Sequence, residues 1–276
     1  MKESTIDLIP IAGLCNRINA IMSAIGLCQK YESVQINVYW PKNSDCFAQL
    51  SDLFNPLSYH KLHNIRFSEL RNPLLQPPTR KNLHITTFLR YPFYSQQYLG
   101  STISNNDIED ILDQYSKVYI YSDNRFCKYV CPDLVGDVFS PISKIAQRVD
   151  HIKSSFSNHT VGIHVRRTDN VVSIKESPIE KFFALMDKEI GQYPDSRFYV
   201  ASDSLEVKRL LVEKYDERII QCDWDLNRTT VQGMQDAVAE LYLLGSTCKI
   251  FGSKGSTFST VASRIKGIPI VFELEG

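Results

Sequence analysis

The segment Val161–Asp169, with the sequence VGIHVRRTD, combines the pattern of a buried strand with a basic end. Apolar residues alternate with Gly162 and His164, which is the period-two pattern of a β-strand. The run ends in Arg166 and Arg167, so positive charge is concentrated where the strand stops. Ligands of open α/β sheets bind at that end of the strands, and paired guanidiniums offer planar forks of donors to the oxygens of a diphosphate. The alternative is a surface loop with two solvated arginines.

A second segment with potential ligand-binding chemistry is GSKGSTFS at 252–259. It is not a phosphate-binding P-loop, because Lys254 precedes Gly255 whereas that motif requires Gly-Lys-Ser/Thr. The segment predicts a turn rich in small and hydroxyl residues that opens a helix. The first N–H groups of a helix, together with hydroxyls such as those of Ser256 and Thr257, can hold a phosphate without a metal ion. An ordinary helix N-cap explains the same residues equally well.

The elements around these two segments alternate regularly. Sequence patterns predict strands at 161–166, 197–201, 218–221, 249–251 and 268–272, and helices at 178–190, 205–215, 233–245 and 256–266. This alternation indicates right-handed crossovers and a parallel sheet, so we expect residues 151–276 to form one Rossmann-like domain. Three strand ends, at 166–169, 202–204 and 252–259, converge on one edge if that sheet is doubly wound.

The first half of the chain has weaker periodicity. Strands are predicted at 5–11, 34–40, 83–89 and 117–121, and helices at 17–30, 47–54 and 141–155, with a loop at 123–140. We expect residues 1–150 to form a second, looser α/β domain. The turn after the first strand contains Gly13, which either presents backbone N–H groups to a ligand or only makes the turn. It is not a dinucleotide fingerprint, because that motif needs three glycines.

Composition limits the classes of function. With 43% hydrophobic and 22% charged residues, the 276-residue chain can bury the core of a globular protein. Its 31 basic and 31 acidic residues cancel, so nothing global attracts nucleic acid or an anionic membrane, and any polyanion site must be local. Glu3 and Asp7 interrupt what would be an apolar signal region, and no later stretch approaches the length of a membrane span. We therefore expect a soluble, cytoplasmic protein without a transmembrane segment and without a nucleic-acid partner.

Neither the cysteines nor the acidic residues suggest a metal. Seven scattered cysteines fit reduced, buried thiols better than a disulfide framework. Cys127 and Cys131 form a CxxxC pair, but no second pair or histidine cluster accompanies them. Asp223 and Asp225 follow a predicted strand, yet a metal clamp there would duplicate the arginine pair. We expect no bound metal.

Four segments together resemble a known superfamily. HVRRTD, FYVASDS and GSTFSTVASRI, in this order, resemble the three C-terminal motifs of the α1,6- and protein-O-fucosyltransferases, and AGLCNRINA resembles their N-terminal Gly-x-x-Asn turn. The resemblance implies a metal-independent, inverting glycosyltransferase of the GT-B class, with two Rossmann-like domains that face a central cleft. It implies GDP-fucose as donor, no cofactor besides this substrate, and a glycan or glycoconjugate acceptor on the side of the N-terminal domain.

Carried over by position, the resemblance places the diphosphate between the arginine pair and the Ser/Thr turn. Arg166 would bind the diphosphate and stabilise the departing GDP, with Arg167 supporting it. Ser256, Thr257 and Phe258 would hold phosphate and ribose. The physical account agrees, because breaking the sugar–phosphate bond puts negative charge on the diphosphate, and fixed positive charge there stabilises the transition state more than the ground state.

The resemblance also assigns residues to the base and to the sugar. His164 and Glu240 would contact the nucleotide base, although the superfamily more often has Asp where Glu240 stands. Asp203 lies in the second motif, and Asn16 and Arg17 would face the donor sugar or the acceptor. Without the resemblance, a histidine on an interior strand is nearly as well explained as a hydrogen-bonded core residue.

The general base is the least defined position. Some relatives place Lys after the Asp of the first motif and Glu several residues later, whereas Asn170 and Ile174 occupy those positions here. Glu176 is near enough in sequence to serve as the base if the loop shifts, and Asp169 is the second candidate. Glu176 can equally be a solvated residue ahead of the helix that begins at Pro178.

Aromatic residues are concentrated in RYPFYSQQY at 90–98. Tyr91, Phe93, Tyr94 and Tyr98 can floor an acceptor groove, because flat rings stack on the C–H faces of sugars. Aromatic residues in such a run more often pack in a core. The sequence leaves both interpretations open.

Three classes of function compete. The leading class is a transferase that moves fucose from GDP-fucose to a glycan hydroxyl, with another GDP-sugar or a UDP-sugar as the alternative donor. The second is a non-catalytic nucleotide- or glycan-binding module, which Asn170 and Ile174 allow. The third, a phosphatase or kinase, is disfavoured because the sequence has neither a true P-loop nor a Cys or Asp nucleophile motif.

Overall fold

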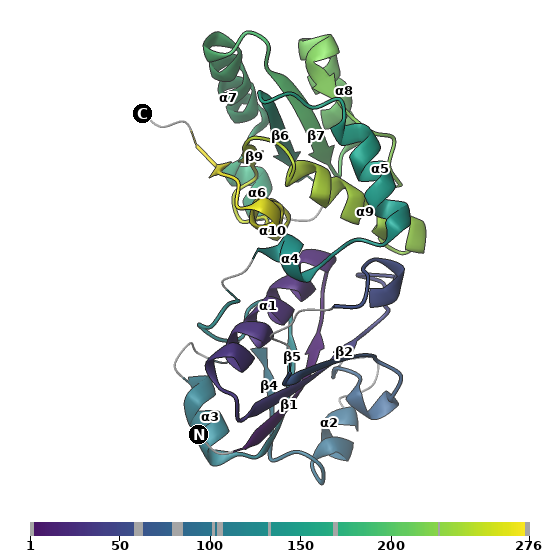
Figure 1. Ribbon diagram of the computed structural model, residues 1–276, viewed down its shortest axis with the longest axis vertical. Helices are drawn as coiled ribbons and strands as arrows, with labels where there is room; N and C mark the ends of the chain where they lie inside the picture. Colours follow the sequence, from purple (N-terminus) through teal and green to yellow (C-terminus); the bar gives the residue numbers. More distant parts are fainter. Residues whose placement is uncertain are drawn as a thin grey trace. The chain divides into compact units, whose positions relative to one another are not determined.

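The computed structural model describes residues 3–57, 63–78, 85–100, 103, 107–131, 134–167, 171–225 and 227–273. The chain forms two compact units, Met1–Asp133 with Arg228–Val231, and Leu134–Asn227 with Gln232–Gly276 (Figure 1). Each unit is mixed α/β and has its own five-stranded sheet. The boundary expected at residue 150 falls inside a helix, Ser143–Lys153, that belongs whole to the second unit, where Arg148 forms an ion pair with Asp236.

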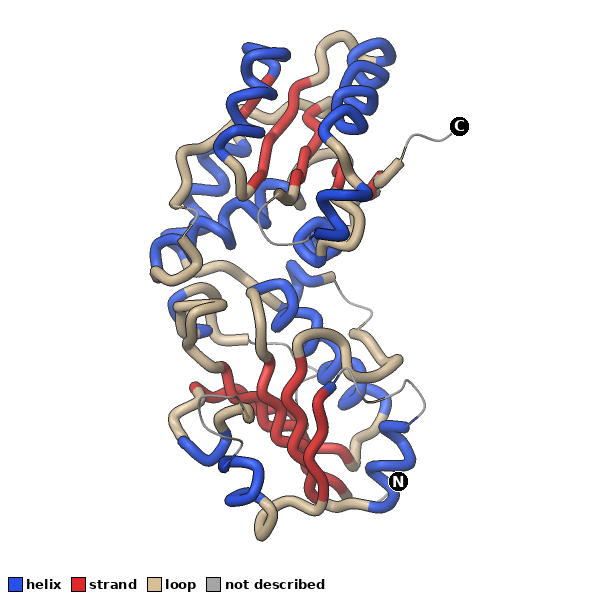
Figure 2. The backbone as a smooth tube through the Cα atoms, turned by 180° about the vertical axis from the view of Figure 1, so that it is seen from behind, coloured by secondary structure: helices blue, strands red, loops and turns tan. Residues whose placement is uncertain are grey.

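The first unit is built on a parallel sheet in the order β3-β2-β1-β5-β4, which Figure 2 shows from behind. Its elements are β1 (Ser4–Pro10), α1 (Leu14–Lys30), β2 (Val34–Trp40), η1 (Leu50–Asp52), β3 (Ile65–Glu69), η2 (Pro73–Leu75), α2 (Ile85–Arg90), β4 (Gln96–Leu99), α3 (Asp107–Gln114) and β5 (Lys117–Ser122). Ile6, Leu8 and Ile9 give β1 apolar side chains on both faces, which suits the central strand of a covered sheet. The strands predicted at 5–11, 34–40 and 117–121 and the helix at 17–30 are confirmed.

The strand expected at 83–89 is wrong, because its described residues lie in helix α2. β-Branched residues in this segment favour a strand by propensity. Arg90 at the end of α2 is fully buried and donates to the carbonyl oxygens of Leu74 and Gln76 at 2.8 Å each. These tertiary hydrogen bonds support the helical docking of a segment whose local pattern suggests otherwise.

Other parts of the first half also depart from expectation. The helix expected at 47–54 is reduced to the three residues of η1, and the loop expected at 123–140 contains the short helix α4 (Val135–Val138). β3 and β4 are the two edge strands of the sheet, and neither is among the predicted strands; Ile65 and Phe67 alternate with polar residues in β3, whereas β4 has no alternating burial pattern. Their pairing with β2 and β5 makes them strands.

The second unit has a parallel sheet in the order β10-β9-β6-β7-β8. Its further elements are α5 (Ser143–Lys153), β6 (Thr160–Val165), α6 (Val171–Glu176), α7 (Ile179–Gln192), β7 (Arg197–Ser202), α8 (Leu205–Tyr215), η5 (Asp216–Arg218), β8 (Ile219–Ile220), α9 (Val231–Leu244), β9 (Ile250–Gly252), α10 (Thr257–Lys266) and β10 (Ile270–Val271). Every strand and helix predicted from residue 141 onward is present, and α6 is an addition. All six residues of β6 are buried, so this strand forms the centre of the core.

In each sheet, the first strand of the unit lies in the middle. β1 has β2 on one side and β5 on the other, and β6 has β7 on one side and β9 on the other. Open α/β sheets bind ligands outside the carboxyl ends of the strands, at the point where the strand order reverses. The residues that follow β6, β7 and β9 therefore meet at the edge where a ligand is expected in the second unit.

Candidate functional site

The convergence predicted for the strand ends of the second unit is observed. The backbone N–H of Arg166, after β6, donates to Ser253 Oγ after β9 at 2.9 Å. The backbone N–H of Arg167 donates to Asp203 Oδ1 after β7 at 2.8 Å. Ser202 Oγ donates to the last carbonyl of β6 at 2.8 Å. Side-chain hydrogen bonds thus hold the three loops together at one edge of the sheet.

Arg166 lies at the centre of this edge with its guanidinium oriented by a carboxylate. Its Nη1 is 3.1 Å from Asp203 Oδ2, and the two side chains are 25% and 18% exposed, respectively. Asp203 therefore positions both arginines, since its other oxygen accepts from the backbone of Arg167. A partly exposed guanidinium that is already fixed in direction can bind an anion at a small cost in side-chain entropy.

The guanidinium of Arg167 donates hydrogen bonds to two backbone carbonyl groups. Its Nη1 donates to the carbonyl oxygen of Arg166 at 3.0 Å, and its Nη2 donates to that of Ser177 at 2.8 Å. Burial lowers the pKa of Arg167, while Asp203 and Glu180 act in the opposite direction. Arg167 therefore shapes the loop that carries Arg166, which is compatible with the supporting role expected for it.

His164 is buried on β6, two residues before Arg166. We call the segment of Arg166 and Arg167 the arginine loop. The Nδ1 of His164 is 2.7 Å from Ser259 Oγ, and its ring stacks on Phe258 with centroids 5.0 Å apart and planes inclined by 23°. Burial lowers the pKa of His164 to about 4, with a further lowering by Arg166 and an opposing effect of Asp203. The imidazole is therefore neutral at neutral pH, and it links β6 to the first turn of α10.

The Ser/Thr turn lies beside the arginine loop because Ser253 and Ser259 bond to β6 and to the residue after it. Gly255 adopts a φ of +73°, a conformation that favours glycine. Ser256 is the N-cap residue of α10, but its side chain makes no capping hydrogen bond. Ser256 thus lies at the N-cap position, as the N-cap interpretation predicts, but its hydroxyl does not cap the helix. Thr257 follows as the first helical residue.

Glu240 on α9 forms a buried ion pair with a lysine that no sequence motif indicates. Its Oε1 is 3.5 Å from Lys208 Nζ on α8, and both residues are at most 9% exposed. Burial raises the pKa of Glu240 to about 7, although Lys208 lowers it, and Asp203 contributes to the rise. One signal in the sequence could have revealed Lys208, which lies three residues before Leu211 on the apolar stripe of α8.

Of the two candidates for the general base, only Glu176 lies among the described residues. Asp169 lies outside the described residues, as does Asn170. Glu176 ends α6, and its Oε2 is 3.3 Å from Lys254 Nζ, with both side chains about half exposed. The backbone N–H of Lys254 donates to Ser177 Oγ at 2.9 Å, so the segment after Glu176 is attached to the Ser/Thr turn. Glu176 as the base stays a prediction.

The N-terminal turn of the first unit gives Arg17 a different role from the expected one. Arg17 is fully buried; its Nε donates to Ala12 O at 2.7 Å, its Nη2 to Asn43 Oδ1 at 2.8 Å, and its Nη1 to Pro41 O. Its guanidinium also lies 5.0 Å from the centroid of Trp40. An arginine without exposed surface cannot contact a sugar, so Arg17 holds together the ends of β1 and β2.

The same turn leaves room beside Gly13. Ala12 carries the positive φ of 62°, and the hydrogen bond from Arg17 holds its carbonyl. Gly13 has an ordinary φ of −72°, and no atom lies within 4 Å of the place where its Cβ would be. Asn16 is half-buried in the first turn of α1. This open space at a helix start is compatible with the expected contact between Asn16 and a ligand.

Among the residues that the structure describes, no cluster suited to a metal stands near the two arginines. Within the described ranges, no three His, Cys, Asp or Glu side chains come together as a metal site, and the seven cysteines are free thiols.

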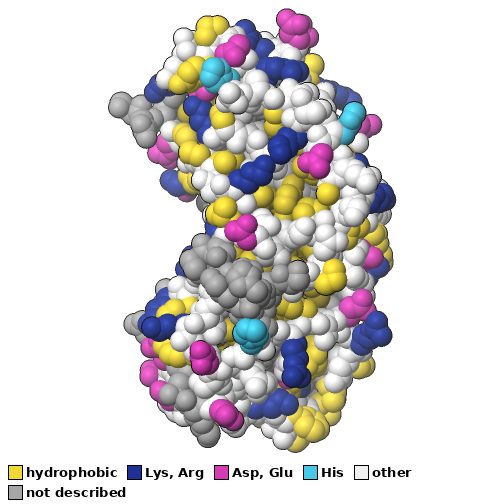
Figure 3. Space-filling model, in the orientation of Figure 1, with side chains coloured by type: hydrophobic (Ala, Val, Ile, Leu, Met, Phe, Trp, Pro, Cys, Tyr) yellow, Lys and Arg dark blue, Asp and Glu magenta, His cyan; other side chains and the backbone are white. Residues whose placement is uncertain are grey.

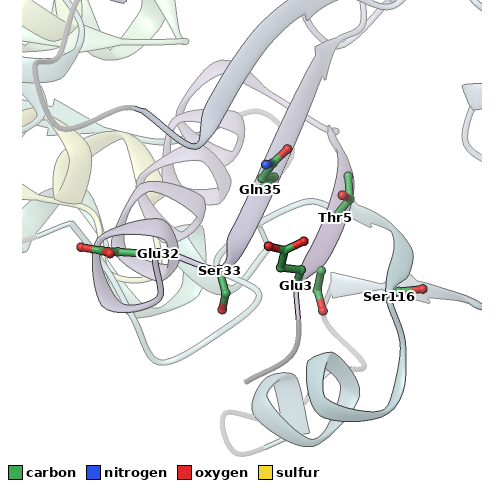
Figure 4. Close-up of a pocket in the computed structure, with 7 residues that line it drawn as sticks. Glu3, Thr5, Glu32, Ser33, Gln35 and Ser116 are labelled. Carbon is green, nitrogen blue, oxygen red and sulfur yellow. The ribbon is translucent and has the colours of Figure 1, made fainter.

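A polar hollow of about 410 Å³ lies at the amino-terminal edge of the first sheet, with Glu3, Glu32, Gln35 and Ser116 among its lining residues (Figure 4). This hollow therefore lies at the edge opposite to the carboxyl edge, where the strand order predicts a ligand.

Comparisons with known proteins agree with this architecture. No protein-family model matches the chain, and no curated protein matches its sequence. Solved structures of fucosyltransferases match nearly the whole chain. NodZ α1,6-fucosyltransferase, co-crystallised with GDP, has a TM-score of 0.66 at 14% identity and covers 100% of this chain and 96% of its own. NodZ from Bradyrhizobium in another crystal has a TM-score of 0.64 at 14% identity, covering 95% and 93%.

Two other fucosyltransferases match the chain with slightly lower TM-scores. POFUT1 in complex with GDP has a TM-score of 0.60 at 12% identity and covers 98% of both chains. A variant of Arabidopsis thaliana FUT1 in complex with GDP has a TM-score of 0.59 at 17% identity and covers 99% of this chain and 71% of its own. The fold is that of these fucosyltransferases, the superfamily that the sequence motifs resemble. At such identities the likeness concerns the fold.

Proposed function

We propose that this protein is a glycosyltransferase that moves fucose from GDP-fucose to a hydroxyl of a glycan or glycoconjugate, with inversion at the sugar carbon and without a metal. One observation carries the proposal. The arginine loop, the Ser/Thr helix start and the stacked His164–Phe258 pair are joined by hydrogen bonds at the switch point of a parallel sheet. The fold shared with fucosyltransferases solved with GDP supports the choice of nucleotide.

In this proposal, Arg166 stabilises the leaving diphosphate. Cleavage of the sugar–phosphate bond increases the negative charge on the phosphate oxygens, and a guanidinium held in place by Asp203 does not have to reorient when that charge develops. Ser256 and Thr257, with the first N–H groups of α10, add neutral donors to the same anion. Together these groups supply the charge stabilisation that a metal provides in other transferases.

The nucleotide base is expected at the buried pair of Glu240 and Lys208. An ionised carboxylate can accept hydrogen bonds from the N–H groups on the Watson–Crick edge of guanine, and Lys208 favours the ionised form of Glu240. Phe258, stacked with His164, offers a flat apolar surface for the ribose. Uracil presents a single N–H on that edge, which is why we favour GDP over UDP.

Inversion requires the acceptor hydroxyl to attack opposite the departing diphosphate. Glu176 or Asp169 is proposed to take the proton of that hydroxyl, and Asn16 to contact the donor sugar or the acceptor. The salt bridge between Glu176 and Lys254 places the Glu176 carboxylate near the Ser/Thr turn.

A nucleotide panel tests the donor. Thermal unfolding of the full chain is measured with GDP, UDP and ADP, since a ligand at one hundred times its Kd stabilises by about 2.7 kcal/mol. We expect the largest rise in Tm with GDP, and a larger rise with UDP would contradict the fucose assignment. Release of GDP from GDP-fucose, measured with EDTA present, tests both catalysis and metal independence. A protein that binds GDP but never releases it from GDP-fucose is the non-catalytic module that Asn170 and Ile174 allow.

A further inference from the structure

The loop after β8 carries a partly exposed tryptophan, Trp224. Its indole Nε1 donates to the hydroxyl oxygen of Tyr199 on β7 at 3.2 Å. The guanidinium carbon of Arg148 on α5 lies 4.6 Å from the centroid of the ring, which is the geometry of a cation–π contact. One face and the N–H edge of the indole are therefore occupied, and the opposite face is the one that can take a ligand.

Buried Asp236 on α9 holds this arrangement in place. Its Oδ1 is 2.5 Å from Arg148 Nη2 and also accepts from Gln232 Nε2 at 2.7 Å. Its Oδ2 accepts from the backbone N–H of Asp225 at 2.8 Å. The arginine behind the ring and the chain directly after Trp224 are thus bound to the same carboxylate. A ring that is fixed before a ligand arrives loses little side-chain entropy on binding.

Trp224 contacts the same side of the sheet that carries the residues proposed for the nucleotide base. In the parallel register of β6 and β7, His164 lies opposite Ala201, two residues after Tyr199. Side chains two residues apart on a strand share a face, so Tyr199 projects from the same face as His164. Burial, and then the charge of Glu240, raise the pKa of the Tyr199 hydroxyl, to which the indole donates. Glu240 and Trp224 are therefore neighbours of one tyrosine.

Cys222, two residues before Trp224, connects this loop to the same carboxylate. Burial raises the pKa of its thiol to about 11, and Glu240 contributes to the rise. Glu240 in turn interacts with Asp203, the residue that holds Arg166. A row of interacting groups thus runs from the arginine loop past Asp203 and Glu240 to the loop of Trp224, which is the order of diphosphate, base and ring.

The chemistry of the ring indicates what it binds. Acidic and basic side chains are interspersed on the face of the second unit that Figure 3 shows, and the whole chain has 31 of each sign, so no broad field of one charge selects a ligand. Nucleobases stack on aromatic side chains through their π faces. A guanidinium behind the indole draws electron density from it, which favours an electron-rich purine on the other face. Within the described ranges, no helix is long and apolar enough to cross a membrane.

We propose that Trp224 is the stacking platform for the guanine of the donor, with Arg148 behind the ring and Glu240 at the edge of the base. This inference rests on the proposed function and adds a residue that lies outside the four segments resembling the fucosyltransferase motifs. Trp224 binds GDP and GDP-fucose alike and takes no part in cleaving the sugar–phosphate bond. Loss of the ring therefore weakens the ground state and the transition state equally, which raises KM and leaves kcat unchanged.

The two tryptophans of the chain allow a direct optical test. Trp40 is 1% exposed, and its Nε1 donates to Ala48 O at 2.9 Å, so Trp224 is the indole that a solute can reach. In the Trp40→Phe variant, GDP should quench the remaining emission and reduce its quenching by acrylamide, because a stacked base covers the ring. In the Trp224→Phe variant, GDP should leave the emission of Trp40 unchanged.

Calorimetry with GDP separates stacking from folding. The Trp224→Leu variant keeps an apolar side chain without a ring and should bind GDP about tenfold more weakly. Trp224→Phe should keep most of the affinity because a ring remains, and Trp40→Phe is the control that should bind like the parent. With GDP-fucose, Trp224→Leu should raise KM by the same factor at an unchanged kcat. Tm values show that each variant is folded.

The outcomes distinguish this inference from the proposed function. GDP binding by the parent without a change in the emission or the acrylamide access of Trp224 would overturn the stacking platform alone. So would a Trp224→Leu variant with a lower Tm and the parent's GDP affinity, because the ring would then only anchor its loop. Absence of GDP binding to the parent would overturn the proposed function, and the stacking platform with it.

Discussion

The two sheets present the same kind of edge and fill it with different chemistry. In each sheet the first strand of the unit lies in the middle, and the order of the parallel strands reverses beside it. Each sheet therefore has a switch point at the carboxyl end of that strand. After β6 the chain places Arg166, whose side chain keeps a quarter of its surface exposed. After β1 it places a neutral turn, and the nearby Arg17 has no exposed surface at all.

The difference teaches that an arginine's partners decide its role. Arg17 bonds to two backbone carbonyls and an amide oxygen of its own unit, so its charge stabilises the loops after β1 and β2. Arg166 is held by the carboxylate of Asp203, which fixes its direction. Arg166 directly follows β6, whereas Arg17 lies in the first turn of the helix that follows β1. The first two of the four following predictions test the contrast between them, and the other two test the edges on which they lie.

The largest effect is expected for Arg166→Ala. Removal of a charge-assisted contact to the diphosphate should weaken GDP binding by about a hundredfold. Isothermal titration calorimetry measures this loss, and Arg209→Ala, which removes an exposed arginine from α8, is the control. Equal affinities of the two variants would remove Arg166 from the site and, with it, the main support for glycosyl transfer.

Arg17→Met should affect stability and leave nucleotide binding intact. The substitution leaves the carbonyl oxygens of Ala12 and Pro41 without their buried donor, so the free energy of unfolding of the first unit should fall by about 3 kcal/mol. Urea denaturation followed by circular dichroism measures the loss. GDP affinity of the folded variant should match that of the parent. A variant of normal stability with impaired GDP binding would reverse the contrast between the two arginines.

The pH dependence of GDP binding should report Glu240. Burial raises its pKa to about 7, and only the ionised carboxylate accepts hydrogen bonds from guanine, so affinity should fall as the pH drops through this range. Lys208 lowers that pKa; the Lys208→Met substitution therefore raises it and should move the fall to higher pH. Titration calorimetry from pH 5.5 to 8.5 locates both midpoints, roughly one unit or more apart. A midpoint that the Lys208→Met substitution does not move would mean that Glu240 does not bind the guanine base.

The smallest effect on stability is expected for Gly13→Ala. The site has an ordinary φ and open space, so the N-cap change should cost at most about 1 kcal/mol. GDP affinity should stay unchanged while fucose transfer slows, because the new methyl group enters the open space at the start of α1. Gly191→Ala, at a similarly open position in α7, is the control. Unchanged transfer would mean that Gly13 only makes the turn.

The sequence predicted the second unit better than the first for a physical reason. Strands such as β6 and β7 are buried and apolar, and their helices carry clear stripes, so local pattern and tertiary environment agree. α2 contradicts its local propensity because Arg90 anchors it through distant carbonyl groups. The edge strand β4 gains its structure from pairing with β5, which its local pattern does not record.

The sequence by itself determined the α/β class, the order of elements in the second unit and the identity of the motif residues at its ligand edge. Only the tertiary structure decided which of these side chains faces outward. His164 became a buried neutral partner of Ser259, Arg17 a buried support, and Lys208 the unforeseen partner of Glu240. Burial and pairing set the charge and the accessibility of an ionisable group, and both depend on segments far apart in the chain.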